Sequence, residues 1–213
     1  MILPALIIFD IDGTLLETER VTVPAVQRTF AAHGLAVPDH DTICGFFGKP
    51  VETYEAWLAE QCPPGMAPRI VAETNALELR LIGSEGRLYD GTRGVLEELY
   101  ATCVLAVCSN GPDDYVNEFL DAHKVRRYLA AVRARGTRHG GKVEMIAEIL
   151  ALDLGAPAIV VGDRHDDIEG AHANGALAVA AAHGFGGDRE LAGADARIAS
   201  IRELPAVIGR LLA

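Results

Sequence analysis

The sequence of 213 residues is poor in aromatic, cysteine and basic residues. Only 6% of the residues are aromatic, so we expect a core of small aliphatic side chains. The four cysteines show no CxxC spacing, which argues against zinc and favours inert core thiols in a reduced, cytoplasmic protein; they are Cys44, Cys62, Cys103 and Cys108. No apolar run is long enough to span a bilayer, and no basic leader with a cleavage site opens the chain.

The deficit of positive charge narrows the possible partners. Lys and Arg number 19 against 30 Asp and Glu, a net charge of −11. Nucleic acids and anionic membranes bind basic faces, so both are disfavoured. A small anionic substrate is still compatible with this net charge if a metal ion and a few positively charged side chains make the binding site locally positive. Oligomeric state is left open between monomer and homodimer.

Half of the residues are hydrophobic, enough for one large domain or one domain with an insertion. Short apolar runs alternate with helical patterns in two parts of the chain, which predicts an α/β fold: a doubly wound parallel sheet with helices on both faces. The strands are expected at 6–9, 104–108, 130–132 (weak), 158–161, 177–180 and 196–198.

A block between the first strand and the rest breaks this alternation. Apolar residues at helical spacing predict three helices there, around 23–30, 51–58 and 70–81. About seventy residues are too many for a simple connection. We therefore expect a core made of residues 1–16 and 87–213, with an inserted all-helical cap domain at 17–86.

Two carboxylates, Asp10 and Asp12, follow the first strand and precede Gly13 and Thr14. Ligands of open α/β sheets bind at the carboxyl ends of the strands. Two acids so close repel each other unless a cation lies between them. Mg²⁺ prefers such oxygen ligands. The alternative is a strand end followed by an ordinary turn, where Asp and Gly are common.

Two further segment ends suit an anion. The strand at 104–108 runs into Ser109, Asn110 and Gly111, whose polar groups can donate to phosphoryl oxygens, although these residues also dominate ordinary loops. Lys142 begins a helix, where anions rather than cations are favoured. An anion bound at that helix end explains the lysine; the alternative is a solvated surface lysine.

Two glycine-rich stretches resemble nucleotide loops without matching them. Residues 136–143 approach a P-loop, but Val143 stands where Ser or Thr must bind Mg²⁺, so we reject that type of nucleotide hydrolysis. Residues 184–187 lack a full GxGxxG and a following βαβ unit, so we interpret them as a flexible loop.

A third group of acids follows the strand at 158–161. Asp163 is placed to be a further Mg²⁺ ligand, and Asp167, one helical turn on, can face the same cleft. Asp166 is expected to point elsewhere and to stabilise the helix start. His165 and His172 are expected at the surface rather than on the metal, because Mg²⁺ prefers oxygen.

Four motifs, in this order, resemble the haloacid dehalogenase superfamily, in its phosphatase branch with a helical cap. The matches are DxDGT at Asp10, Asp12, Gly13 and Thr14; Ser109-Asn110; Lys142; and GDxxxD at Gly162, Asp163 and Asp167. Val143 departs from the proline that often follows the lysine. Asp12 separates the chain from the dehalogenases and the transport ATPases of that superfamily. The run at 184–195 is similar to phosphoglycolate phosphatases.

The resemblance implies a Mg²⁺-dependent phosphomonoester hydrolase with Asp10 as nucleophile and Asp12 as acid and base. It implies phosphoryl contacts from Ser109 and Lys142. Further substrate contacts would come from Gly13, Thr14, Asn110, Gly111, Gly48 and Lys49. Asp10, Asp163 and the main-chain carbonyl of Asp12 would hold Mg²⁺, and Asp167 would complete the metal site by orienting the metal's waters or Lys142.

The loop at 45–50 resembles a specificity loop, in which Lys49 either reaches a substrate carboxylate or second phosphate or is simply exposed. The substrate is expected to be a small phosphorylated metabolite, with phosphoglycolate as the first guess. A sugar-phosphate mutase, a 5'-nucleotidase and a non-catalytic phosphate-binding protein are the alternatives.

Overall fold

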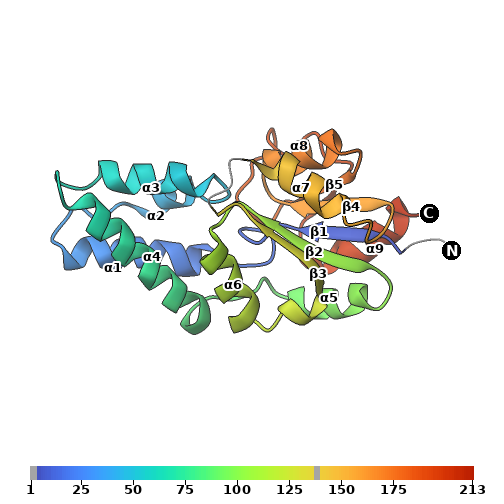
Figure 1. Cartoon of the computed structure of the whole chain (residues 1–213), viewed down its shortest axis with the longest axis horizontal. Coiled ribbons are helices and arrows are strands. Elements are labelled where there is room, and N and C mark those ends of the chain that lie inside the picture. The colour runs from blue at the N-terminus through green and yellow to red at the C-terminus, as the bar shows by residue number, and fades with distance from the viewer. Residues whose placement is uncertain (1–3, 137–139) are drawn as a thin grey trace.

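The computed structural model describes residues 4–136 and 140–213, and its strands form one parallel sheet (Figure 1). The order is β3-β2-β1-β4-β5-β6, an open doubly wound arrangement that confirms the predicted α/β class. The strands are β1 (Leu6–Phe9), β2 (Val104–Ser109), β3 (Leu129–Ala134), β4 (Ala158–Gly162), β5 (Leu177–Ala181) and β6 (Ala196–Ile198).

The central strand β1 is buried along its whole length. Leu6 pairs with Val104 of β2 on one side and with Ala158 of β4 on the other. Because a central parallel strand is covered on both faces, its sequence is a continuous apolar run rather than an alternating one. The carboxyl end of β1 therefore lies between the carboxyl ends of β2 and β4.

The described part of the chain has nine α-helices in addition to the sheet. They are α1 (Glu19–Ala32), α2 (His40–Cys44), α3 (Val51–Glu60), α4 (Ala67–Ser84), α5 (Thr92–Tyr100), α6 (Asp113–Ala122), α7 (Lys142–Leu150), α8 (His165–Ala173) and α9 (Leu204–Leu211). None of them is long and apolar enough to cross a bilayer.

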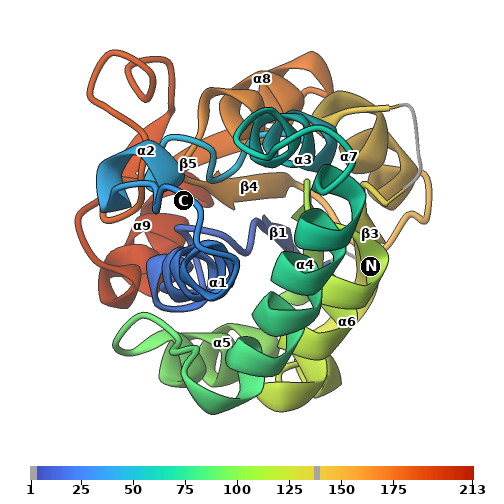
Figure 2. The same cartoon turned by 90° about the vertical axis from the view of Figure 1, so that its left-hand side faces the viewer.

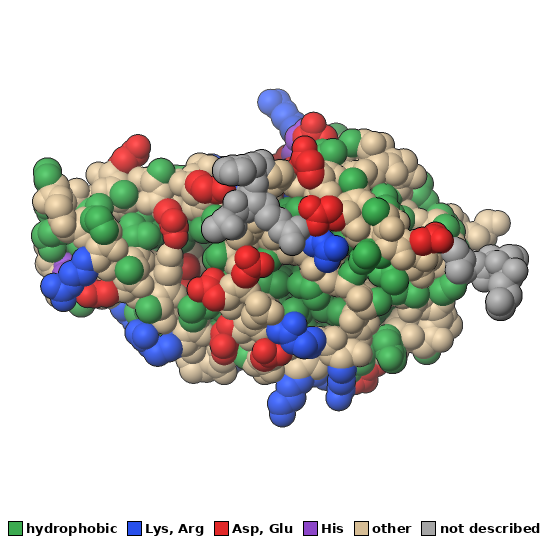
Figure 3. All heavy atoms as spheres, in the orientation of Figure 1, with side chains coloured by type: hydrophobic (Ala, Val, Ile, Leu, Met, Phe, Trp, Pro, Cys, Tyr) green, Lys and Arg blue, Asp and Glu red, His purple; other side chains and the backbone are tan. Residues whose placement is uncertain are grey.

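Alternate residues of the strands face different helices. Leu6 and Ile8 of β1 belong to the cluster with α7 and α8, whereas Ile7 and Phe9 belong to the cluster with α5, α6 and α9. Charged side chains of both signs are interspersed over the face of the molecule shown in Figure 3.

Helices α1 to α4 lie together beyond the carboxyl ends of the strands (Figures 1 and 2). Val26, Phe30, Ile43, Leu58 and Ile70 form part of a third apolar cluster inside this helical block. The ends of the block nearest the sheet, including Val21 and Ile82, pack instead into the cluster of the sheet. The segment that interrupts the βα alternation thus faces the edge of the sheet where ligands bind.

Several local expectations need correction. The short helix α2 was not predicted, and β3 spans six residues rather than three because it pairs with β2 through Ala134. Of the four free thiols only Cys108 is buried, and burial raises its pKa to about 12; the other three are half-buried. Residues 137–139 of the P-loop-like stretch lie outside the described residues.

Candidate active site

Acids from two strand ends and a lysine from a helix start meet in one buried cluster. Asp10 follows β1, Asp163 follows β4, and Asp167 lies in the first turn of α8. Carboxylate oxygens of these three residues lie within 4.8 Å of one another. Lys142, the first residue of α7, places Nζ 2.8 Å from Asp10 Oδ1 and also pairs with Asp167.

The cluster is almost completely removed from solvent. Lys142 is 3% exposed, and Asp163 is fully buried. Burial raises the pKa of Asp10, an effect that Lys142 opposes and the neighbouring acids reinforce. Burial alone would lower the pKa of Lys142, but the carboxylates of Asp10 and Asp167 outweigh it and raise that pKa. One ammonium thus faces three carboxylates, which leaves an excess of negative charge.

The donor set fits a divalent cation with oxygen ligands. Burial raises the pKa of Asp163 to about 8, an effect that the nearby Asp167 reinforces. Asp163 Oδ1 is buried and has no hydrogen-bond partner among the described residues. Buried acceptors are nearly always paired, so such an atom points to an unrecorded ion or water. Three close carboxylates and an open acceptor are the chemistry that Mg²⁺ requires.

Two glycines let the backbone approach this cluster. A Cβ added at Gly13 would lie 2.2 Å from Asp163 Oδ2, and Gly13 also has a φ of +73°. A Cβ at Gly162 would lie 2.0 Å from Asp167 Cγ. Any side chain at either position would displace a carboxylate, which explains why both motifs need glycine there.

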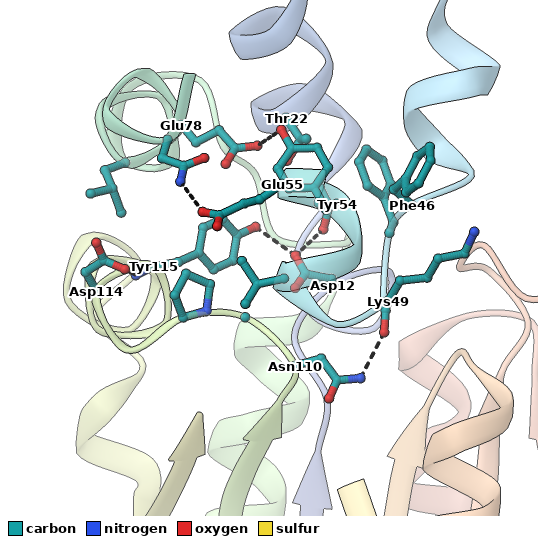
Figure 4. A pocket seen from close by; sticks show the side chains of 18 of the residues that line it. Asp12, Thr22, Phe46, Lys49, Tyr54, Glu55, Glu78, Asn110, Asp114 and Tyr115 are labelled. Carbon is teal, nitrogen blue, oxygen red and sulfur yellow. Dashed lines mark hydrogen bonds between the residues drawn. The ribbon is translucent and has the colours of Figure 1, made fainter. Parts of the chain in front are cut away.

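Asp12 lies apart from the three clustered acids and lines the adjoining cavity. Its Oδ1 accepts hydrogen bonds from Tyr115 Oη at 2.7 Å and from Thr18 Oγ1 at 2.8 Å (Figure 4). Burial raises the pKa of Asp12, and these two hydrogen bonds oppose the rise. The carboxyl group is therefore fixed in orientation, and its pKa lies above the ordinary value of an aspartate.

The end of β2 supplies the polar loop that the sequence predicted. Ser109 is fully buried, and its Oγ accepts from the Gly111 amide at 3.1 Å. Asn110 Nδ2 donates to Gly48 O at 2.9 Å, which joins the sheet to the helical block. Asn110 Oδ1 is buried without a partner in the described chain, as is Thr14 Oγ1.

Asp166 was expected to point away from the site, and the structure places it closer. Its Oδ2 accepts from Asn110 Nδ2 at 2.6 Å. It lines a second hollow together with Gly48, Lys49, Lys142 and other residues. Asp166 lies in the first turn of α8, next to Asp167, and its carboxylate meets the loop of Asn110 while that of Asp167 meets Lys142. His172 contacts Asp195 at 2.9 Å, away from the acids.

The glycine-rich loop at 184–187 was interpreted as flexible and given no part in the site. Its Phe185 amide donates to Asp163 Oδ2 at 2.7 Å, and the Phe185 ring contacts Phe47 of the helical block with centroids 4.7 Å apart. The sequence offers no motif for this contact, because a main-chain donor carries no side-chain signal. Tyr115 and Thr18, which hold Asp12, were missed for a related reason: each belongs to a helical segment without a motif.

A cavity of about 220 Å³ extends from Asp10 and Asp12 toward the helical block (Figure 4). Its wall includes Asn110 and Gly111 from the sheet side and Gly48 and Lys49 from the loop before α3. Ser109, Gly13 and Thr14 are not among the residues that line this cavity. Lys49 is exposed, and its Nζ lies 4.7 Å from the centre of the Phe46 ring.

The sequence pattern of the haloacid dehalogenase-like hydrolases matches residues 7–181 of this chain, a span that holds all four motifs. The chain belongs to this family. The match confirms the resemblance stated from the motifs.

Individual relatives are similar at modest identity. The chain is 28% identical over 188 residues to the tyrosine-protein kinase PtkA of Mycobacterium tuberculosis, covering 86% of this chain and 64% of that protein. The chain thus spans less than two thirds of the length of the mycobacterial relatives. It is 26% identical over 200 residues to a phosphoglycolate phosphatase of Pseudomonas syringae, covering 89% and 74% of the two chains.

A solved structure of a haloacid dehalogenase-like family hydrolase from Streptococcus pneumoniae superposes with a TM-score of 0.82. It is 25% identical to this chain and covers 97% of it and 98% of its own length. The helical block and the sheet of the present chain are therefore both part of an arrangement shared with that relative.

Proposed function

We propose that this haloacid dehalogenase-like hydrolase hydrolyses small phosphomonoesters through a phosphoryl-Asp10 intermediate. The observation that carries the proposal is the placement of two acids with different surroundings at one cavity. Asp10 belongs to the buried carboxylate cluster and contacts Lys142, whereas Asp12 lies outside that cluster, lines the cavity and is held by the hydroxyls of Tyr115 and Thr18. A nucleophile beside the phosphoryl group and a proton carrier beside the leaving oxygen need this division.

In the first step, an Asp10 carboxylate oxygen attacks phosphorus. The new bond joins Asp10 to phosphorus while the bond to the leaving oxygen breaks, and Asp12 gives its proton to that oxygen. In the second step, water attacks phosphorus, Asp12 takes the proton, and the bond to Asp10 breaks. Ser109, the Asn110 amide and Lys142 would hold the phosphoryl oxygens.

Asp10, Asp163, Asp167 and the main-chain carbonyl of Asp12 would hold Mg²⁺, with Asp167 also positioning Lys142. When bound, Mg²⁺ supplies positive charge that stabilises the phosphoryl oxygens. The unpartnered Asp163 Oδ1 supports this assignment. We also propose that residues 17–86 act as a cap on a core of 1–16 and 87–213. The Asn110–Gly48 hydrogen bond and the ion pair from Arg135 to Glu52 at 3.2 Å support it.

Phosphate release from p-nitrophenyl phosphate and from a panel of phosphorylated metabolites, with Mg²⁺ present, tests the proposal. We expect turnover that EDTA abolishes and added Mg²⁺ restores. Full turnover without metal contradicts the metal assignment. No release from any phosphomonoester contradicts the proposed activity and favours a phosphate-binding protein.

The panel also separates the remaining alternatives. Phosphoglycolate, after the Pseudomonas relative, is the reference compound. A hexose phosphate that is isomerised without release of free phosphate indicates a mutase. A nucleoside monophosphate turned over faster than every smaller ester indicates a 5'-nucleotidase.

A further inference from the structure

The cavity has a second end that the proposed chemistry does not use. Beyond Asp12 its wall is formed by α3, α4 and the start of α6, which contribute Tyr54, Glu55, Glu78 and Asp114. Asp12 is the proposed donor to the leaving oxygen. The group attached to that oxygen must therefore occupy this second end, which we call the leaving-group end.

Acids dominate the leaving-group end. Glu78 is 7% exposed and accepts from Tyr54 Oη at 3.0 Å, while Glu55 Oε1 accepts from Asn75 Nδ2 at 2.6 Å. Burial raises the pKa of Glu78 to about 7. A cation bound beside this carboxyl group would favour its ionised form and would be held by it. Asp114 adds a third carboxylate at the rim.

Positive charge is scarce there. Lys49 is the one cationic side chain among the described residues that line the cavity. Figure 4 shows its ammonium pointing away from Glu55 and Glu78, on the far side of Phe46. Asn110, which is 4% exposed, has an unpartnered buried acceptor, Oδ1, on the sheet side of the same cavity. Its orientation is fixed because Nδ2 donates to two acceptors.

Aromatic faces add to the same preference. Aromatic residues make up 6% of the chain, yet four of them line this one cavity, namely Phe46, Phe47, Tyr54 and Tyr115. The faces of such rings attract cations, most strongly where water is excluded. Carboxylates and ring faces together favour a positively charged group that donates hydrogen bonds.

We propose that the preferred substrates are phosphomonoesters whose leaving group carries an ammonium group, that is, amino-alcohol phosphates. The inference rests on the proposed hydrolysis and assigns the substrate class of that same site. An anionic leaving group such as glycolate would bury its carboxylate against Glu55 and Glu78, which is unfavourable without a paired cation. The cavity volume of about 220 Å³ leaves room for a small leaving group.

The test compares kcat/KM for four esters with Mg²⁺ at one pH: ethanolamine phosphate, glycerol phosphate, phosphoglycolate and p-nitrophenyl phosphate. We expect kcat/KM for ethanolamine phosphate to exceed that for phosphoglycolate by at least about tenfold, because a hydrogen bond to a charged group usually contributes at least that factor. It should also exceed that for glycerol phosphate. Equal kcat/KM values for these esters, or a higher value for phosphoglycolate, overturn the inference. In that case, hydrolysis of p-nitrophenyl phosphate still supports the proposed function. No turnover of any ester contradicts the function itself.

Variants at the acids locate the effect. Glu78→Gln and Glu55→Gln should each lower the ratio of ethanolamine phosphate to phosphoglycolate, by about tenfold for the more buried Glu78. Glu60→Gln, which removes the same charge from the exposed end of α3, serves as the matched control and should leave the ratio unchanged. If Glu78→Gln fails to fold, Glu55→Gln decides. A ratio that is insensitive to both folded variants overturns the inference.

Discussion

The sheet end and the leaving-group end of the cavity both contain buried acids, but the acids have different neighbours. At the sheet end, Asp10 and Asp167 contact Lys142, and Asp163 keeps an open oxygen. At the leaving-group end, Glu78 contacts the Tyr54 hydroxyl and has aromatic rings nearby. The two ends therefore suit different tasks in the proposed function. The sheet end would act on the phosphoryl group, and the leaving-group end would select the group attached to it.

Removal of the proposed nucleophile is the strongest way to break this comparison. Asp10→Asn should lower kcat/KM for every ester by at least about 10³-fold, because no other group can form the intermediate. Phosphate release measures the loss, and circular dichroism checks that the variant is folded. Substantial residual turnover by a folded variant would mean that the sheet end does not supply the nucleophile.

The two lysines near the cavity should differ in their contribution to stability. Lys142→Met leaves Asp10 and Asp167 buried without their partner, which costs about 3–5 kcal/mol. Lys49→Met, the matched control, removes an exposed charge and should change stability by no more than about 0.5 kcal/mol. Urea unfolding at neutral pH measures both. Equal effects would show that the ion pairs of Lys142 contribute nothing specific.

A glycine substitution tests how closely the sheet end is packed. Gly162→Ala forces a Cβ into the Asp167 carboxylate and should destabilise the chain by about 1–3 kcal/mol. Gly187→Ala is the control, since a Cβ there meets no atom of the described chain within 4 Å. The same unfolding experiment applies. A Gly162→Ala variant as stable as the control would contradict the geometry.

Metal-free protein should also show a pH dependence of its stability. Asp163 has a folded pKa of about 8, against about 3.9 in an unfolded chain. Between these values the folded state holds a proton that the unfolded state has released, so stability falls as pH rises, by up to about 1.4 kcal/mol per pH unit. Glu78, with a pKa of about 7, acts in the same direction below pH 7.

Adding Mg²⁺ distinguishes the contribution of Asp163 to this pH dependence from that of Glu78. Saturating Mg²⁺ should remove the Asp163 part of the slope between pH 6 and 7, because the metal favours the ionised carboxylate. The Glu78 part should remain. Asp163→Asn should show no Mg²⁺ effect on the slope. Thermal melts at several pH values provide the readout, and a slope in wild type that Mg²⁺ leaves unchanged would contradict the metal assignment.

The sheet end was largely predictable from sequence because its residues follow buried strands. Asp10, Ser109 and Asp163 each come directly after an apolar run, and parallel strands bring such ends to one edge. The fold class followed from the same runs. The contact from the Phe185 amide was unpredictable, because it depends on where a loop of the backbone lies.

The leaving-group end was not predictable in the same way. Tyr54 and Glu78 are 24 positions apart on different helices, and their contact depends on how α3 packs on α4. Helical spacing tells which residues share a face, but not which face of a neighbour they meet. The sequence therefore drew attention to Lys49, as a substrate contact or an exposed lysine, and not to the acids and aromatic rings deeper in the cavity.

Trapping the covalent intermediate tests the central claim most directly. The Mg²⁺-loaded chain is mixed rapidly with a phosphomonoester that it turns over, quenched in acid and digested for peptide mass spectrometry. The account predicts a phosphoryl group on the peptide that contains Asp10, and its absence in Asp10→Asn. Phosphate release with no phosphorylated peptide, or with the phosphoryl group on a residue other than Asp10, would contradict it.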